Sequence, residues 1–387
     1  MMKGKARTGA GLAVLLLIVL AGAGAWLWTR SGAPTVKRAV LISRQPYTFN
    51  EELPVKSVRA APRVNIVAGR GNVSVVAADA LELRVAATKI AYARNPEAAQ
   101  AAAARALISV TDNADGSYQV QTSGEEALGE QGALSIQVQV PRKTILNSTT
   151  GTGDVRVAGI LGGVVAETGS GAINIRDSGG AISVNQTQGD VHVVGASGDV
   201  KVTGRGNELE IADVTGQVTV EAPFFASMHL ARIAGALRLL SARVDLNISR
   251  LDGTVESTME DIKILNVSGN ISLRAQDCEV HIENPGGRIE IAGYGADMHL
   301  QYSRPPREDL AINSRSADIS VSLPAGSSFQ LNAQTMDGNL NSDFTGLTPG
   351  GDPEDNNLLL YGQVGRRGPS LQIHSEFGDI NIRKAGS

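Results

Sequence analysis

Cysteine and aromatic residues are scarce in this chain, and neither sign of charge dominates it. Aromatic side chains make up 4% of the 387 residues, and the only tryptophans are Trp26 and Trp28. The single cysteine, Cys278, excludes an intramolecular disulfide framework and is expected to be a small core residue rather than a reactive thiol. A formal charge of −4 provides no basic surface for nucleic acid, which is therefore excluded as a partner.

Glycine, in contrast, is abundant. The 44 glycines are not spaced at every third residue, which excludes a collagen-like chain. Together with Val, Ile, Leu and Ala, they predict short strands joined by many tight turns.

The N-terminus carries the longest apolar run. Basic residues precede an uncharged stretch at 9–28, which is long enough to span a bilayer as a helix. Trp26 and Trp28 fall where an interfacial belt is expected. The pattern predicts a transmembrane anchor over 1–30, contacting the membrane through 9–28, with a cytoplasmic N-terminus and a single pass.

A cleaved signal peptide is the alternative for the same segment. Its apolar region would be Leu12–Leu20, and Ala21-Gly22-Ala23 or Ala23-Gly24-Ala25 would be the cleavage site. Either interpretation places the rest of the chain in the periplasm or outside the cell.

Two segments are expected before the repetitive part of the chain. Prolines without sustained periodicity predict a stalk over 31–62. Alternating strands and one helix are predicted over 63–140, and could cap the following domain. The helix is expected to start at Asn95 as N-cap with Pro96 in its first turn, and to continue to Leu107.

From residue 141 to 384 the pattern predicts a β-solenoid. Units such as Gly153-Asp-Val-Arg-Val157 recur every nine residues, with one spacing of ten and one of seven. Stacked strand–turn–strand units would bury a continuous core. The first apolar positions are Val155, Val164, Ile173, Ile182, Val191, Val200, Leu209, Val218, Met228, Leu237, Leu246, Val255, Ile262, Ile271, Val280, Ile289 and Met298.

A second period of eighteen residues lies under the first. Acids precede alternate units, and four of the five histidines occupy the middle position of the same set. This favours two strands per coil, in parallel stacks about 4.8 Å apart, over a three-sided helix. The set comprises Asp154, Asp190, Glu208, Asp245, Asp261, Glu279 and Asp297, with His192, His229, His281 and His299. The fold class is therefore all-β, a parallel β-solenoid of nonapeptide units with one short N-terminal helix besides the membrane helix.

The repeat spreads out after Met298. Residues 345–369, rich in Gly, Pro, Asp and Asn, are expected to be a disordered or functional loop excursion. The segment 360–384 is expected to cap the second end of the solenoid, because open strand edges invite aggregation.

Two stretches and the C-terminal end are similar to a known family. Val140-Pro141, Leu146-Asn147 and Gly153–Val157 are echoed by Leu323-Pro324, Leu331-Asn332 and Gly338-Asn-Leu340; Leu371-Gln-Ile373 and Gly378–Ile382 follow near the end. Together they resemble the bacterial putative-adhesin family of unknown function, which includes LiaG-like envelope proteins. The resemblance covers about 50–384. It implies a surface or periplasmic β-solenoid, often behind one membrane helix, and supplies no catalytic residues.

The acids and histidines are the candidate binding groups. Glu279 and His281, with Asp297 and His299 one coil later, would form an outward two-by-two patch able to bind zinc or another transition metal. Polar residues that merely fill an exposed position are the competing interpretation. For the acid column, a solvated edge that resists strand addition is favoured over calcium, because the turns hold one glycine. No cofactor is expected.

The sequence favours a non-enzymatic, membrane-anchored envelope protein. Its solenoid would present an adhesin-like interaction or structural surface to an envelope protein or glycan, with the acid–histidine face as the first place to look. The alternatives are a carbohydrate-active enzyme on a β-helix, or a regulatory partner of an envelope stress-sensing system. The nine-residue units between Val155 and Met298 leave no room for loops that would build a cleft, and no motif of nucleophilic, metal-dependent or phosphate chemistry is present. The oligomeric state stays open.

Overall fold

A computed structural model describes residues 44–352, 354 and 356–385. Residues 45–387 cluster as one compact unit. The predicted anchor over 1–30 and the first part of the predicted stalk lie outside the described residues. Within the described ranges, none of the helices has the length and hydropathy needed to cross a bilayer.

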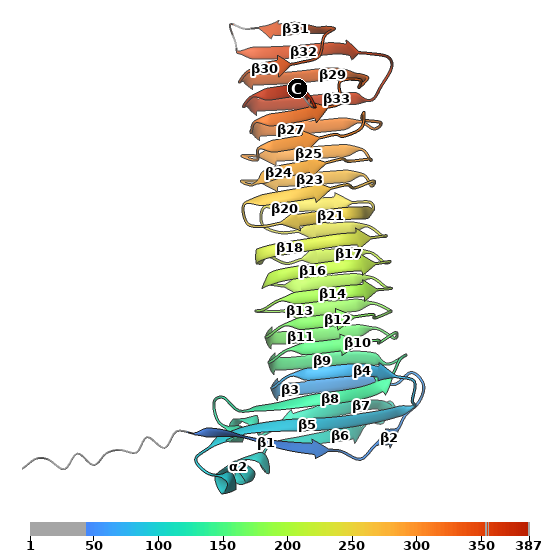
Figure 1. Ribbon diagram of the computed structural model, residues 1–387, viewed down its shortest axis with the longest axis vertical. Helices are drawn as coiled ribbons and strands as arrows, with labels where there is room; N and C mark the ends of the chain where they lie inside the picture. Colours follow the sequence, from blue (N-terminus) through green and yellow to red (C-terminus); the bar gives the residue numbers. More distant parts are fainter. Residues whose placement is uncertain (1–43, 353, 355, 386–387) are drawn as a thin grey trace, which may run out of the picture. The chain divides into compact units, whose positions relative to one another are not determined.

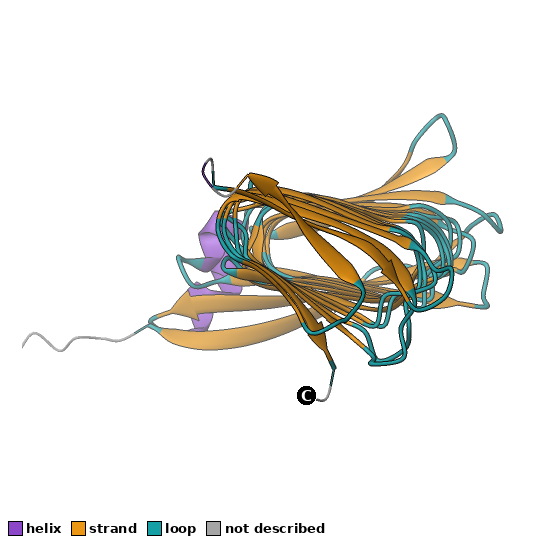
Figure 2. Cartoon of the chain, turned by 90° about the horizontal axis from the view of Figure 1, so that it is seen from above, coloured by secondary structure: helices purple, strands orange, loops and turns teal. Residues whose placement is uncertain are grey.

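Most of the described chain belongs to two long sheets that face each other (Figures 1 and 2). Sheet 1 contains, in spatial order, β1 (Gln45–Glu52), β5 (Glu82–Ala93), β8 (Ala133–Pro141), β4 (Val73–Ala78), β10 (Val155–Ala158), β12 (Ile173–Arg176), β14 (Val191–Ala196), β16 (Gly206–Val214), β18 (Phe224–Ile233), β21 (Leu251–Ser257), β22 (Asp261–Leu265), β24 (Glu279–Glu283), β26 (Met298–Gln301), β28 (Ile319–Leu323), β34 (Ile380–Lys384) and β30 (Leu340–Ser342).

Sheet 2 contains, in the same direction, β6 (Leu107–Asp112), β7 (Ser117–Ser123), β3 (Arg63–Arg70), β9 (Ile145–Thr152), β11 (Val164–Ser170), β13 (Ile182–Gln186), β15 (Val200–Gly204), β17 (Val218–Glu221), β19 (Leu237–Leu240), β20 (Val244–Ile248), β23 (Ile271–Gln276), β25 (Ile289–Tyr294), β27 (Leu310–Ser316), β33 (Ser370–Phe377), β29 (Phe329–Asp337), β32 (Asn357–Val364) and β31 (Leu347–Asp352).

The eighteen-residue coil is confirmed. Val155 pairs with Ile173, and Ile173 with Val191, in parallel strands of sheet 1, while Val164 pairs with Ile182 in sheet 2. Successive nine-residue units therefore alternate between the sheets, and the chain forms a two-sided coil (Figure 2). The two apolar positions of each unit point inward, as with Val155 and Val157, which are 0% and 2% exposed. Burying both of them makes the layer between the sheets a continuous apolar core.

The repeated glycines are required where coils stack closely. Gly171 has φ +138°, and a Cβ there would lie 2.3 Å from the carbonyl oxygen of Gly153 in the previous coil. A neighbouring inward side chain reaches the same carbonyl, because Thr168 Oγ1 donates to Gly153 O at 3.1 Å. Gln186 Nε2 donates to Gly171 O in the same way one coil later, at 2.9 Å. These turns thus combine a close backbone approach with a bond to the coil before.

The solenoid is not parallel throughout, which corrects one prediction. β19 and β20 form an antiparallel pair in sheet 2, and β21 and β22 form one in sheet 1. The strands β20 and β21 therefore run antiparallel to the strands on either side of them. The seven-residue spacing between Val255 and Ile262 falls where the chain turns back for the second time. There a hairpin joins β21 to β22 within sheet 1, instead of a connection that crosses to sheet 2. Asp245 consequently lies in sheet 2, outside the acid-bearing set to which its spacing assigned it.

Two pairs of strands are inserted between coils out of their order along the chain. β3 and β4 lie between β7 and β9 and between β8 and β10, respectively. At the other end, β33 lies between β27 and β29, and β34 between β28 and β30. The predicted cap over 360–384 is therefore wrong for β33 and β34, which fill the sheet interior.

Two further segments differ from the expectations. The predicted loop 345–369 holds β31 and β32, an antiparallel hairpin that extends sheet 2 beyond β29. Within the predicted stalk, β1 pairs antiparallel with β5 along its whole length, and β2 (Lys56–Ser57) also pairs with β5. The strands in both segments are held by pairing with other strands. Local periodicity in the sequence therefore did not reveal them.

The predicted helix is present as α2 (Pro96–Ala103). Asn95 Oδ1 accepts the N–H of Ala98 at 2.8 Å, as expected for an N-cap, but the helix ends at Ala103 and Leu107 begins β6. With the 3₁₀ turn η1 (Glu125–Leu128), it packs beside β5 at the N-terminal end of the stack. Cys278 is 8% exposed and belongs to the core, as predicted.

Candidate functional site

A row of charged and polar side chains crosses the outer face of sheet 1, and contains the four histidines of the predicted set. The strand register aligns Arg156, Asn174, His192, Glu210, His229, Glu256, Lys263, His281, His299 and Ser320. His192 Nδ1 lies 3.1 Å from Glu210 Oε2, and His229 Nδ1 lies 3.6 Å from Glu256 Oε1. Each of these histidines therefore faces a carboxylate on the next strand.

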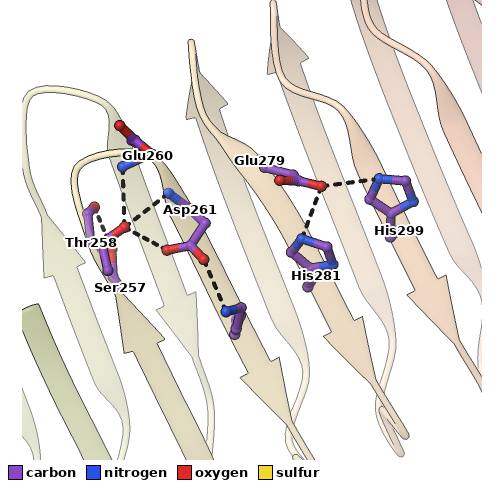
Figure 3. Close-up of polar contacts among 8 residues, drawn as sticks. Ser257, Thr258, Glu260, Asp261, Glu279, His281 and His299 are labelled. Carbon is purple, nitrogen blue, oxygen red and sulfur yellow. Dashed lines mark hydrogen bonds and ion pairs between the residues drawn. The ribbon is translucent and has the colours of Figure 1, made fainter.

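Three of the four residues predicted to bind a metal lie together (Figure 3). Glu279 Oε1 is 3.1 Å from His281 Nε2 and 3.3 Å from His299 Nε2, and the two imidazole rings stack with centroids 5.0 Å apart. The side chains are 31%, 46% and 51% exposed for His281, His299 and Glu279. The cluster is open to solvent. The same carboxylate oxygen, Glu279 Oε1, faces both imidazole rings.

The fourth residue has a different role. Asp297 Oδ1 accepts the backbone N–H of Asp318 on the following coil at 2.9 Å, so its carboxylate is directed at a turn. Among the residues the structure describes, no group of three or more His, Cys, Asp or Glu side chains is arranged to hold a metal ion.

Three acids of the column, Asp154, Asp190 and Asp297, accept backbone N–H groups of the next coil. Asp154 Oδ1 accepts the N–H of Ala172 at 2.9 Å, and Asp190 Oδ1 accepts that of Glu208 at 3.3 Å. Asparagine serves equally, because Asn72 Oδ1 accepts the N–H of Asp154 at 2.9 Å. The short oxygen-bearing side chain after the turn thus bonds the next coil, as an Asx residue caps a local N–H.

Asp261 holds the β21–β22 hairpin (Figure 3). Thr258 Oγ1 donates to its carboxylate and accepts the backbone N–H groups of Glu260 and Asp261, both at 3.2 Å. The Thr258 hydroxyl and then the Lys263 ammonium, 3.0 Å away, hold the pKa of the Asp261 carboxyl below its usual range. This acid therefore stabilises the chain reversal.

The outer face of sheet 2 carries two adjoining hollows. One, of about 490 Å³, lies over β23, β25, β27, β33 and β29; the other, of about 650 Å³, lies over β17, β19, β20, β23 and β25. They share Ser272 and Glu290. Small side chains at Ser272, Ala292 and Ala311 leave room between longer neighbours, which forms the depression. This face was not singled out by the sequence.

The carboxylate content of these hollows differs from that of a typical glycosidase site. Glu290 is the single carboxylate among the residues that line them, and its Oε1 lies 3.6 Å from Arg288 Nε. Glycoside hydrolysis commonly needs two carboxylates on opposite sides of the scissile bond.

Sequence reasoning missed these residues for an identifiable reason. Asn332 and Gln372 lie in the very motifs that suggested the family, where they looked like outward filler between buried leucines and isoleucines. Only the insertion of β33 between β27 and β29 places Gln372 between Ala311 and Asn332. The remaining histidine, His374, reaches the same face through that insertion.

Comparisons with known proteins find a family match in the C-terminal part of the chain. Residues 241–383 match the Toastrack DUF4097 family. This supports the adhesin-family resemblance seen in the sequence, and the match begins at the turn between β19 and β20 where the winding reverses. No curated protein sequence matches the chain.

One solved structure is similar in part. It is a putative cell adhesion protein from Clostridium sporogenes, 11% identical, and the match covers 88% of this chain and 100% of that one with a TM-score of 0.20.

Proposed function

We propose, from the match of residues 241–383 to the Toastrack DUF4097 family, that the protein is a non-enzymatic, adhesin-like component of the bacterial envelope. In this proposal, residues 9–28 anchor it in the membrane and the solenoid binds an envelope macromolecule. The partner meets the outer face of sheet 2 rather than the acid–histidine face of sheet 1.

The pair of adjoining hollows on sheet 2 is the observation that carries this assignment. They extend over strands β17 to β29 and share Ser272 and Glu290, so they form one elongated depression across successive coils. A repetitive face of this kind suits an elongated partner that makes many weak contacts. On sheet 1, by contrast, the histidines of the row already face carboxylates of the same sheet.

Binding of purified residues 45–387, which cluster as one compact unit without the proposed anchor, to isolated bacterial envelopes tests this function. Ser272→Trp would fill the depression where the two hollows meet, and is expected to reduce co-sedimentation with the envelopes. Ser320→Trp is the matched control, since Ser320 occupies an outward strand position on sheet 1. Equal retention of both variants, or no retention of the unmodified protein, contradicts the proposal.

The same preparation tests the enzymatic alternative. Incubation with envelope polysaccharides is expected to release no shorter fragments, as judged by size-exclusion chromatography. Fragment release that disappears in Glu290→Gln would instead favour a carbohydrate-active enzyme.

A further inference from the structure

The outward side chains of sheet 2 form two parallel rows across its C-terminal strands. The strand register aligns one row as Thr219, Arg238, Asn247, Ser272, Glu290, Ala311, Gln372, Asn332 and Tyr361. The second row contains Arg274, Ala292, Asn313, His374 and Gln334. With neighbouring strands about 4.8 Å apart, the first row extends over roughly 40 Å.

The character of these rows changes along the sheet. Around β19 to β25 they include charged groups, and Arg288 at their margin pairs with Glu290 and Asp309. Across β27, β33 and β29 the side chains lining the hollow carry no fixed charge: Ala311, Asn313, Gln372, His374, Asn332 and Gln334. This part of the surface offers hydrogen bonds without an electrostatic preference for ions.

The amides of this part have unused hydrogen-bonding capacity. The side chains of Asn313, Asn332 and Gln372 are exposed and make no hydrogen bond with any residue of the described ranges. Gln334 is the exception, because its Nε2 donates to Asn357 Oδ1 at 2.9 Å. Each free amide can donate two hydrogen bonds and accept two, which matches the mixed donors and acceptors of a sugar hydroxyl or an acetamido group.

An aromatic ring lies next to Asn332 in the row. Tyr361 on β32 pairs with Asn332 across an antiparallel ladder and is 46% exposed. An exposed tyrosine presents a flat apolar surface with a polar tip. Such a surface fits the apolar face of a pyranose ring while neighbouring amides bind its hydroxyls.

We propose that an uncharged, extended glycan chain binds across β27, β33 and β29, with Asn313, Gln372 and Asn332 as hydrogen-bonding residues and Tyr361 as a stacking surface. The proposal rests on the proposed function, and specifies the partner of its sheet 2 face. A neutral ligand is favoured over an acidic one because the lining residues of these three strands include no lysine or arginine. An extended chain is favoured because the depression crosses successive coils.

Calorimetric titration of the purified full-length protein tests the ligand class. The probes are chitohexaose and cellohexaose as neutral glycans, a hexamer of galacturonic acid as the anionic one, and an uncharged Ser-Asn-Gly peptide of similar length. A neutral hexasaccharide is expected to bind with an affinity that hardly changes between low and high salt, since no ion pair is formed. The anionic hexamer and the peptide are expected to bind at least tenfold more weakly.

Paired amide variants locate the site. Asn332→Ala combined with Gln372→Ala is expected to weaken neutral glycan binding by about tenfold or more, from the loss of two sets of hydrogen bonds. Asn341→Ala combined with Asn381→Ala is the control, because these residues occupy outward positions of β30 and β34, in the same two coils but on sheet 1. The control is expected to bind as the unmodified protein does.

Three results would overturn the inference: no binding of either neutral hexasaccharide at millimolar concentration, equal loss in both double variants, or preferential binding of the anion or the peptide. Any of them, combined with envelope binding that Ser272→Trp still abolishes, would refute the glycan assignment and leave the proposed function standing. Loss of envelope binding as well would refute both.

Discussion

Asp154 Oδ1 accepts the backbone N–H of Ala172, eighteen residues later and one coil further along sheet 1, at 2.9 Å. Asp190 accepts the N–H of Glu208 at the same spacing, and Asp297 accepts that of Asp318, which lies 21 residues later on the following coil. These three carboxylates of the predicted column therefore bond successive coils to each other. At these positions the acid supports the stacking of the solenoid.

Replacing Asp154 tests this role. Asp154→Ala leaves the Ala172 N–H without its acceptor and is expected to destabilise the fold by about 1 kcal/mol. Asp154→Asn retains the oxygen and loses only the exposed ion pair with Arg156, so it should cost much less. Urea denaturation midpoints measure both. Glu208→Ala is the control, because the Glu208 side chain makes no hydrogen bond or ion pair with the described residues; an equal loss in this control would argue against this role.

Gly171 tests the close stacking of turns. Gly171→Ala is expected to cost at least about 2 kcal/mol, because the alanine would adopt φ +138° and its Cβ would lie 2.3 Å from Gly153 O. Gly326→Ala is the matched control, since a Cβ there meets no atom within 4 Å, and should stay within about 0.5 kcal/mol of the unmodified protein. Thermal melts of both variants should separate them; similar melting temperatures would contradict the stacking argument.

The burial of Tyr302 predicts how the stability of the fold changes at high pH. Burial raises the pKa of its phenol above the usual range. In the unfolded chain the phenol ionises near pH 10, whereas in the folded protein it keeps its proton, so the unfolded state binds fewer protons and stability falls as the pH rises above about 10. Urea midpoints measured between pH 8 and pH 11 should fall less steeply in Tyr302→Phe. Tyr294→Phe, at a side chain that is 50% exposed, should leave the slope unchanged; identical slopes in all three proteins would contradict the prediction.

Cys278 should be protected from alkylation. It is 8% exposed, and burial raises the pKa of its thiol. The reactive thiolate is therefore disfavoured in the folded protein. Mass spectrometry after maleimide treatment should find little modification under native conditions and complete modification in denaturant. Rapid modification of the native protein would show that this region opens readily.

The local pattern of the chain predicted the repeating part of the fold well. Apolar pairs such as Val155 and Val157 after a turn glycine are sufficient to specify a short strand with one buried side, and the eighteen-residue period then specifies two strands per coil. The close approach of Glu279, His281 and His299 followed from the same period. The different role of Asp297 did not follow from this period. Whether an acid points along the face or into a turn depends on which backbone N–H groups lie within its reach.

Long-range pairing explains the remaining errors. Leu371-Gln-Ile373 has the pattern of a solenoid strand whichever strands flank it, so its insertion between β27 and β29 is not visible in the sequence. In the sequence, the only indication of the reversed direction of β20 and β21 is the irregular spacing of the repeat. For the same reason the amides of sheet 2 could not be grouped in advance, since Asn313, Gln372 and Asn332 are neighbours only after that insertion.

Photo-crosslinking in living cells tests most directly which face meets the partner. A photoreactive amino acid placed at Ala311 would project from sheet 2, and one at Ser320 would project from sheet 1. The strands β27 and β28, which carry them, follow one another along the chain, so both probes report on the same level of the stack. Ultraviolet irradiation is expected to give high-mass products from Ala311 and few from Ser320. Equal yields from the two positions, products from Ser320 alone, or none from either would contradict binding through sheet 2.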